Sequence, residues 1–263
     1  MPGLTSARRS AAVGVRRATG RHTDMSRASP LDRSLSAATA GVFATLAKLR
    51  RARGVHPHGI GFGGVLTLQT GPGLDLVPGL GAPRSVPAVL RLSRSFGLPR
   101  PLPDLLGVAV KLPDMHGPGR DQDFLLVSAL DGRLSKYVPL PAPRYSWRAY
   151  SSLIPYRSDG RLVLPGALGA SPDAATSEDE MTGALHAAEH GDLRFRLAVA
   201  PALGRFTSFG EIGVTHRLPQ SEVQALRFNP FHTAQSLTPA GGPLNAMRRA
   251  AYPASQRARR DAP

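Results

Sequence analysis

Six segments of the chain carry runs of apolar and β-branched residues, separated by clusters of glycine and proline. The runs are GIGFGGVLTLQT, SVPAVLRLSRSF, LLGVAVKLPD, QDFLLVSAL, DLRFRLAVAP and FTSFGEIGVTHRL. In the fifth run, apolar residues from Leu193 to Val199 alternate with Arg194 and Arg196, which is the period of a strand with one solvated face. Six such runs without helices between most of them predict an antiparallel barrel or sandwich.

Helical patterns are predicted towards both ends of the chain and once within it. Between Asp32 and Arg53, apolar residues recur near helical spacing and basic residues gather in the last turns, where the helix dipole favours them. A C-terminal helix is predicted from Pro243, with a bend at Pro253. The acidic stretch SPDAATSEDEMTG predicts a loop that leads into a short helix near MTGALHAAEHG.

The amino-acid composition limits the kind of core and the kinds of reactive and metal-binding groups that the protein can have. The 263 residues are 41% apolar and only 6% aromatic, so the core must be largely aliphatic. The absence of cysteine excludes disulfides, thiolate nucleophiles and cysteine-ligated zinc or iron–sulfur clusters. Any metal must therefore be held by histidine, carboxylate or tyrosine.

The net charge of +15 is concentrated in two arms. Residues 1–54 carry 11 Lys/Arg against 2 acids and residues 241–263 carry 5 against 1, which leaves 17 against 15 between them. Residues 1–30 lack periodicity, and we expect a disordered basic arm there, followed by one domain over residues 31–263. Such an arm can bind phosphates without specificity, but no recognition helix, aromatic ladder or zinc finger accompanies it, so we expect no specific nucleic-acid partner.

The sequence also predicts where the protein resides. No apolar run approaches the roughly 18 to 20 residues that a membrane-spanning helix needs. Near the N-terminus, Arg16 and Arg17 interrupt the apolar stretch before it becomes an export signal. We therefore expect a cytoplasmic protein without a membrane span.

His56 and His58 stand two residues apart in the segment VHPH. On a strand they would share a face, but a stable metal site needs a third or fourth ligand. The histidines further along the chain show no ligand spacing: His116, His186, His190, His216 and His232. We therefore expect most histidines to be surface or structural residues.

Three segments, in order along the chain, resemble strands of the haem catalases. RGVHPHGIGFG, residues 53–63, resembles the strand opening that carries the distal histidine. VLRLSR, residues 89–94, resembles the next strand, in which an arginine and a serine flank one apolar residue. DLLGVAVKL, residues 104–112, resembles the strand after that.

A fourth segment, RRAAYPASQRAR at residues 248–259, resembles the family's proximal haem-ligand helix. It places Arg248 four residues before Tyr252, and these are followed by Pro253, Gln256, Arg257 and Arg259. The segment FNPFHTAQSLTPAGGPLNAMRRAAY and the short chain are similar to the small catalase-related haem proteins of this superfamily. The resemblance implies an α+β fold, an antiparallel β-barrel with flanking N- and C-terminal helices.

The resemblance further implies haem b as cofactor. Tyr252 would be the axial iron ligand, as in catalases, and Arg248 one helical turn away would stabilise its phenolate. Arg53, Arg91 and Arg259 would bind the haem propionates, because the planar guanidinium suits carboxylates and stays charged.

On the distal side, the resemblance implies that His56 moves a proton between the two peroxide oxygens. Ser93 would hold its imidazole in one tautomer, and Val55 would narrow the approach to the iron. His58 falls where the family has a small or basic residue, so it is not expected to be a ligand.

One departure from the family bears on activity. The stretch RDQDFLLVSAL lacks the asparagine that supplies a distal amide in catalases, and Ser128 is the nearest polar candidate. Loss of such a preorganised donor costs on the order of 10²-fold in rate. The expected function is therefore peroxidase-type reduction of hydrogen peroxide or an organic hydroperoxide, with an electron donor that the sequence does not identify.

Two other functions stay open, and so does an oligomeric state. The protein could keep the haem and rearrange hydroperoxides, or it could be a haem-free barrel that acts as a binding module through its basic arms.

Overall fold

The computed structural model describes residues 59–99, 102–146, 149–170, 180–233 and 236–241. Its strands are β1 (Gly59–Leu68), β2 (Ser85–Arg94), β3 (Leu106–Leu112), β4 (Gln122–Ala129), β5 (Ala149–Ser151), β6 (Tyr156–Ser158), β7 (Arg161–Gly169), β8 (Arg194–Pro201), β9 (Thr207–Arg217) and β10 (Leu237–Pro239). Its helices are α2 (Pro72–Asp75), α3 (Glu180–Glu189) and α4 (Gln220–Ala225), with 3₁₀ turns at Pro78–Leu80 and Ser135–Tyr137.

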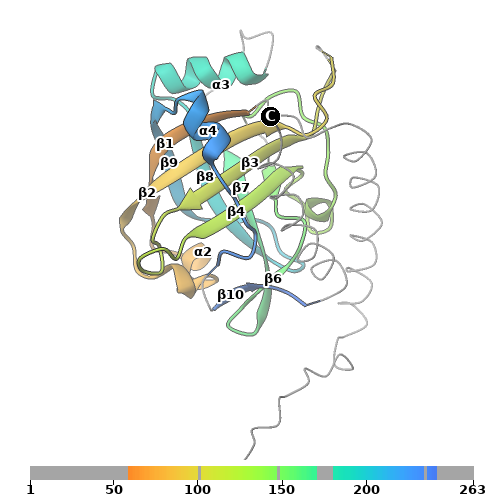
Figure 1. Cartoon of the computed structure of the whole chain (residues 1–263). Coiled ribbons are helices and arrows are strands. Elements are labelled where there is room, and N and C mark those ends of the chain that lie inside the picture. The colour runs from red at the N-terminus through yellow and green to blue at the C-terminus, as the bar shows by residue number, and fades with distance from the viewer. Residues whose placement is uncertain (1–58, 100–101, 147–148, 171–179, 234–235, 242–263) are drawn as a thin grey trace, which may run out of the picture.

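Eight of the strands form a closed antiparallel barrel. They are hydrogen-bonded in the order β7-β5-β4-β3-β2-β1-β9-β8, and the pairing of β8 with β7 closes the ring. Figure 1 shows these strands wrapping around one interior, and β6 and β10 extend the sheet below it. The prediction of an antiparallel barrel is confirmed, and the six runs named above became β1, β2, β3, β4, β8 and β9. The predicted terminal helices, at about 32–53 and from 243, and the basic arm at 1–30 lie outside the described residues.

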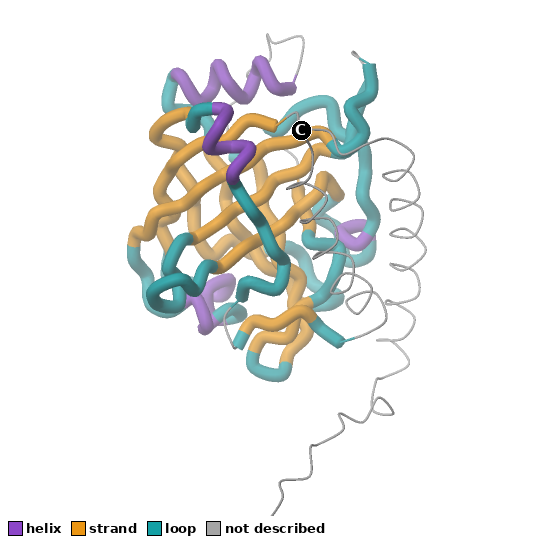
Figure 2. Tube along the Cα trace, in the orientation of Figure 1, coloured by secondary structure: helices purple, strands orange, loops and turns teal. Residues whose placement is uncertain are grey.

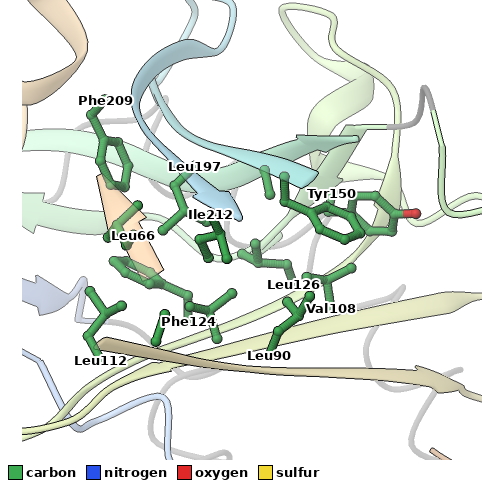
Figure 3. Close-up of a cluster of buried hydrophobic side chains, with 14 of the residues drawn as sticks. Leu66, Leu90, Val108, Leu112, Phe124, Leu126, Tyr150, Leu197, Phe209 and Ile212 are labelled. Atoms are coloured by element: carbon green, nitrogen blue, oxygen red, sulfur yellow. The ribbon is translucent and has the colours of Figure 1, made fainter. Parts of the chain in front are cut away.

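Alternation along each strand fills the interior with aliphatic and aromatic side chains. Every second residue of β3, from Leu106 to Leu112, is at most 1% exposed, while the residues between them are half-buried. Figure 3 shows side chains from opposite walls meeting in this core: Leu66, Leu90, Val108, Leu112, Phe124, Leu126, Tyr150, Leu197, Phe209 and Ile212. The other face of β1–β4 is therefore turned outward.

The pattern of apolar runs in the sequence did not predict strand β7. Pro165 and Gly166 interrupt it, and proline is rare inside a strand because it cannot donate a ladder hydrogen bond. Its start nevertheless carries a hairpin signal, because Asp159-Gly160 forms the two-residue connection from β6, with positive φ at both residues.

Helical segments lie at the two ends of the barrel. α3 lies over one end, where α4 also contacts β1, and α2 lies at the other (Figure 2). The short helix predicted near MTGALHAAEHG is confirmed as α3. Across the described ranges, we find no helix with the length and apolar character to cross a membrane.

A buried lysine joins the loop after β4 to the loop between β8 and β9, on the outside of the barrel wall where Tyr137 and Phe206 pack against β5, β7 and β8. The Lys136 side chain is fully buried, and its ammonium donates to the carbonyl oxygens of Arg133 (2.9 Å) and Gly204. The neighbouring Tyr137 hydroxyl donates to the carbonyl of Ala202 at 2.8 Å. Burial lowers the pKa of Lys136 to about 8, although the negative charge of Asp131 opposes the shift.

This shift predicts a pH-dependent contribution to stability. Because the pKa of Lys136 is lower in the folded chain than the ordinary 10.5, the unfolded chain binds more protons between these values, and stability rises with pH there. We expect the free energy of unfolding of the wild type to increase relative to that of Lys136→Met as the pH rises above about 8. The increase is at most about 1.4 kcal/mol per pH unit. Urea titrations at several pH values measure the difference, in which groups common to both proteins, such as Tyr137, cancel. A constant difference across this range would contradict the assignment.

Candidate functional site

Strand β2 places two of the predicted site residues on the outer face of the barrel. Leu90 and Leu92 point into the core, with exposed fractions of 1% and 0%. Arg91 and Ser93 alternate with them, so their side chains lie on the opposite, outward face. The structure therefore brings these two predicted residues together.

Glycines on the neighbouring strands make room for both side chains. Gly59 of β1 and Gly107 of β3 are the cross-strand partners of Ser93. A Cβ atom at Gly59 would lie 2.7 Å from Nη2 of Arg91, and one at Gly107 would lie 2.7 Å from Oγ of Ser93. Any larger residue would displace the guanidinium or the hydroxyl. We call Gly59, Arg91, Ser93, Gly107 and the Arg91 partner Ala109 the outer patch.

A buried tyrosine holds the backbone beneath the outer patch. The Tyr145 hydroxyl donates to the carbonyl oxygen of Ser93 at 2.8 Å. Burial raises the pKa of Tyr145 well above its ordinary value, with Tyr150 and Glu180 acting in the same direction and Arg91 opposing. The hydroxyl thus keeps its proton and stays a donor, which fixes the carbonyl of Ser93.

The end of β2 is held by ion pairs. Nε of Arg94 lies 3.5 Å from Oδ2 of Asp104 and 2.9 Å from Oε1 of Glu180, the first residue of α3. The buried Asp104 carboxylate also accepts hydrogen bonds from the backbone N–H groups of Phe96 and Leu98, at 3.0 and 3.2 Å. These contacts bind α3 and the loop after β2 to the barrel beside the outer patch.

Strand β4, the neighbour of β3 in the sheet, presents apolar side chains on the outer face beside the patch. Val127 pairs with Gly107 and Leu125 pairs with Ala109, so both lie on the outer face. Ser128 falls on the other face, where its hydroxyl accepts from the N–H of Leu106 at 3.1 Å and donates to the carbonyl of Leu140. The sequence made Ser128 the nearest polar candidate to replace the missing distal amide. These bonds correct that expectation, because they hold the hydroxyl within the barrel wall.

A second polar group lies further along the same face, and we call it the ion-pair cluster. Nζ of Lys111 donates to Asp121 and to Asp123, both at 2.8 Å. Asp123 is fully buried and also accepts from the backbone N–H of Asn229 at 2.8 Å, while Nδ1 of His232 lies 3.4 Å from its Oδ2. The cluster binds residues 229–232 to β3 and β4.

The cation of the ion-pair cluster is the ammonium group of Lys111. Ligand atoms of Asp121, Asp123 and His232 lie within 4.8 Å of one another, as in a metal site. Burial acts to lower the pKa of Lys111, but hydrogen bonds to the two carboxylates outweigh it, and the pKa is raised. The ammonium therefore stays charged between the carboxylates. No sequence spacing pointed to this group, because His232 lies more than 100 residues from Asp123 in the chain.

The remaining predicted site residues lie outside the described part of the chain. They are Arg53, Val55, His56, Arg248, Tyr252 and Arg259; His58, which is not expected to be a ligand, lies outside it as well. Their assignments stay predictions.

No family model matches the sequence, and no curated protein matches it. Solved structures match the fold, however. A bacterial catalase aligns with a TM-score of 0.56 and 12% identity over 84% of this chain and 60% of its own. A fungal catalase aligns with a TM-score of 0.58 and 13% identity over 82% and 62%, and catalase A from Saccharomyces cerevisiae with 0.57 and 13% over 84% and 64%.

The fold is thus catalase-like, and the chain spans less than two thirds of the length of these catalases.

The ion-pair cluster predicts unequal effects of two aspartate substitutions. Asp123→Ala would leave Lys111 and the N–H of Asn229 without their buried partner, so we expect a loss of about 3 kcal/mol in the free energy of unfolding. Asp121→Ala is the matched control, because the Asp121 side chain is 27% exposed, and we expect it to cost less than about 1 kcal/mol. Urea unfolding of both variants measures the difference. Equal losses would show that Asp123 is not the centre of the cluster.

Proposed function

We propose that this protein is a catalase-related haem protein that reduces peroxides by a peroxidase-type reaction. The observation that carries the proposal is the outer patch. In a catalase-like barrel, Arg91 and Ser93 are packed side by side over glycines of the adjacent strands. The haem-binding domain would comprise residues 31–263, preceded by a basic arm at 1–30.

The outer patch and the β4 residues beside it fit the proposed cofactor. Haem is a flat apolar macrocycle with two carboxylates at one edge, so it needs a surface of small and apolar residues with a cation beside it. Gly107 and Ala109 provide small residues, and Leu125 and Val127 provide apolar ones. The Arg91 guanidinium provides the charge, in a planar form that pairs well with a carboxylate.

In this proposal Tyr252 would bind the iron, and Arg248 would stabilise its phenolate by charge. Arg53 and Arg259 join Arg91 in binding the propionates. These four further residues come from the resemblance of their segments to catalases, and the fold likeness supports them indirectly.

The bound haem would supply the iron centre at which the O–O bond of the peroxide is cleaved. His56 would take the proton from one peroxide oxygen and deliver it to the other, so that the departing oxygen leaves as a neutral molecule. Ser93 would accept or donate a hydrogen bond that keeps the imidazole in one tautomer. Val55 would limit how closely larger groups approach the iron.

The described part of β4 favours an organic hydroperoxide over dismutation of hydrogen peroxide. Its outward residues beside the patch are Leu125 and Val127, which offer no amide to orient hydrogen peroxide but can pack against an alkyl group. Reduction of such a substrate to its alcohol and water consumes two electrons from an external donor. A hydroperoxide-rearranging enzyme would use no donor, so product analysis with a lipid hydroperoxide, with and without a reductant, separates the two reactions.

Haem reconstitution tests the proposal directly. We expect the wild type reconstituted with haemin to show a Soret band and Tyr252→Phe to lose or strongly shift it, because phenylalanine offers iron no ligand. Tyr137→Phe is the control, since the Tyr137 hydroxyl bonds to the carbonyl of Ala202 and its ring packs outside the wall of β5, β7 and β8, on other strands than the outer patch. An unchanged spectrum in Tyr252→Phe, or no Soret band in the wild type, would exclude the proposal. Salt-dependent binding to nucleic acid by a protein that takes up no haem would favour the binding-module alternative instead.

The outer patch predicts that substitution of Arg91 weakens haemin binding without abolishing it. Arg91→Ala removes one guanidinium from the propionates, so we expect haemin to bind about tenfold more weakly, which corresponds to about 1.4 kcal/mol for a charge-assisted hydrogen bond. Arg196→Ala is the matched control, because Arg196 is also an outward arginine of a barrel strand, on β8. Haemin titrations followed at the Soret band give both affinities. If the two variants bind haemin equally well, Arg91 does not contact the cofactor.

A further inference from the structure

The C-terminal end of α3 brings two histidines into contact. His186 lies in the last turn and His190 directly follows the last helical residue, Glu189, at the four-residue spacing that puts side chains on one face. Both are exposed, and their ring centroids are 4.2 Å apart with an interplanar angle of 31°. We assigned no ligand spacing to these histidines from the sequence, although the helix predicted near MTGALHAAEHG puts them at i and i+4.

A hydrogen bond sets the tautomer of one ring. Nδ1 of His190 lies 2.8 Å from the carbonyl oxygen of His186. A carbonyl can only accept, so Nδ1 carries the hydrogen and Nε2 carries the lone pair. Metal-binding histidines show this arrangement, in which one ring nitrogen donates to a carbonyl and the other binds the ion.

The end of the helix favours a cation at this position. The helix ends at Glu189, but the backbone N–H of the next residue, His190, still bonds to the carbonyl of His186 at 3.2 Å, and Gly191 follows with a φ of +73°. Carbonyl groups of the last turn carry partial negative charge, which stabilises a nearby positive ion. The exposed carboxylates of Glu189 and Asp192 add negative charge to the same segment.

We propose that His186 and His190 bind one divalent transition-metal ion of the zinc type at the surface of α3. Imidazole is a preferred ligand of Zn²⁺, Ni²⁺ and Cu²⁺, and pairs of histidines spaced i and i+4 on a helix are a recurring way to bind zinc. With only two protein ligands, this is a weaker site than a structural zinc site, which has three or four; water molecules complete the coordination, so the site is open and exchanges its ion. The site is separate from the outer patch and does not depend on haem.

Metal binding here would also stabilise α3. The first residue of the helix, Glu180, is already bound to Arg94 of the barrel. An ion across His186 and His190 would fix the last turn as well, and a ligand that binds only the folded chain raises its melting temperature.

Zinc titration of the full-length protein tests the proposal. Isothermal titration calorimetry should show one Zn²⁺ ion bound per wild-type chain, and His186→Gln and His190→Gln should each weaken the binding by at least about tenfold. His216→Gln is the matched control for an exposed histidine elsewhere, and it should leave the affinity unchanged. His232→Gln distinguishes the ion-pair cluster from α3, and it should also have no effect.

Three results would overturn the proposal: no zinc binding by the wild type, equal binding by the wild type and His186→Gln, or loss of binding in His232→Gln. Circular dichroism of each variant checks that the fold is retained, so a loss of affinity reports on the ligand. The haem spectrum is an independent readout. A protein that binds zinc at α3 and takes up no haem would support this site while excluding the proposed function.

Discussion

The pairing of β7 with β8 is the constraint on which the rest of the structure depends. Seven residues of β7, from Val163 to Gly169, pair with β8, and β7 also pairs with β5, so the eight strands close into a ring. Closure removes unpaired strand edges and gives every barrel strand an inner and an outer face. The inner face is filled by aliphatic and aromatic side chains, which leaves the outer face as the place for polar chemistry.

The polar groups on that outer face are ordered by strand register. Residues that pair across β1, β2 and β3 put the Arg91 guanidinium over Gly59 and the Ser93 hydroxyl over Gly107. Further along the same strands, Lys111 faces Asp123 by the same register. A slip of one residue in β2 would turn Arg91 and Ser93 into the core and destroy the outer patch. Stability and the candidate site therefore rest on the same pairing.

Parts of the fold and of the site were accessible from sequence. Alternating apolar runs predicted six barrel strands, because the period of two depends only on neighbouring residues within each run. Arg91 and Ser93 were predicted because their segment, VLRLSR, resembles a strand of the haem catalases. β7 was missed because Pro165 and Gly166 break its pattern, although the Asp159-Gly160 dipeptide before it was a usable hairpin signal.

The sequence by itself determined the strands, from the alternation of neighbouring residues, their antiparallel arrangement, from the lack of helices between most of them, and the largely aliphatic core, from the low aromatic content. Only the tertiary structure decided that β7 and β8 close the barrel, that Ser128 is committed to backbone groups, and that His232 meets Asp123. The physical reason is distance along the chain. Local periodicity is set by residues two to four positions apart, whereas closure and the ion-pair cluster join segments that are brought together only when the whole barrel forms.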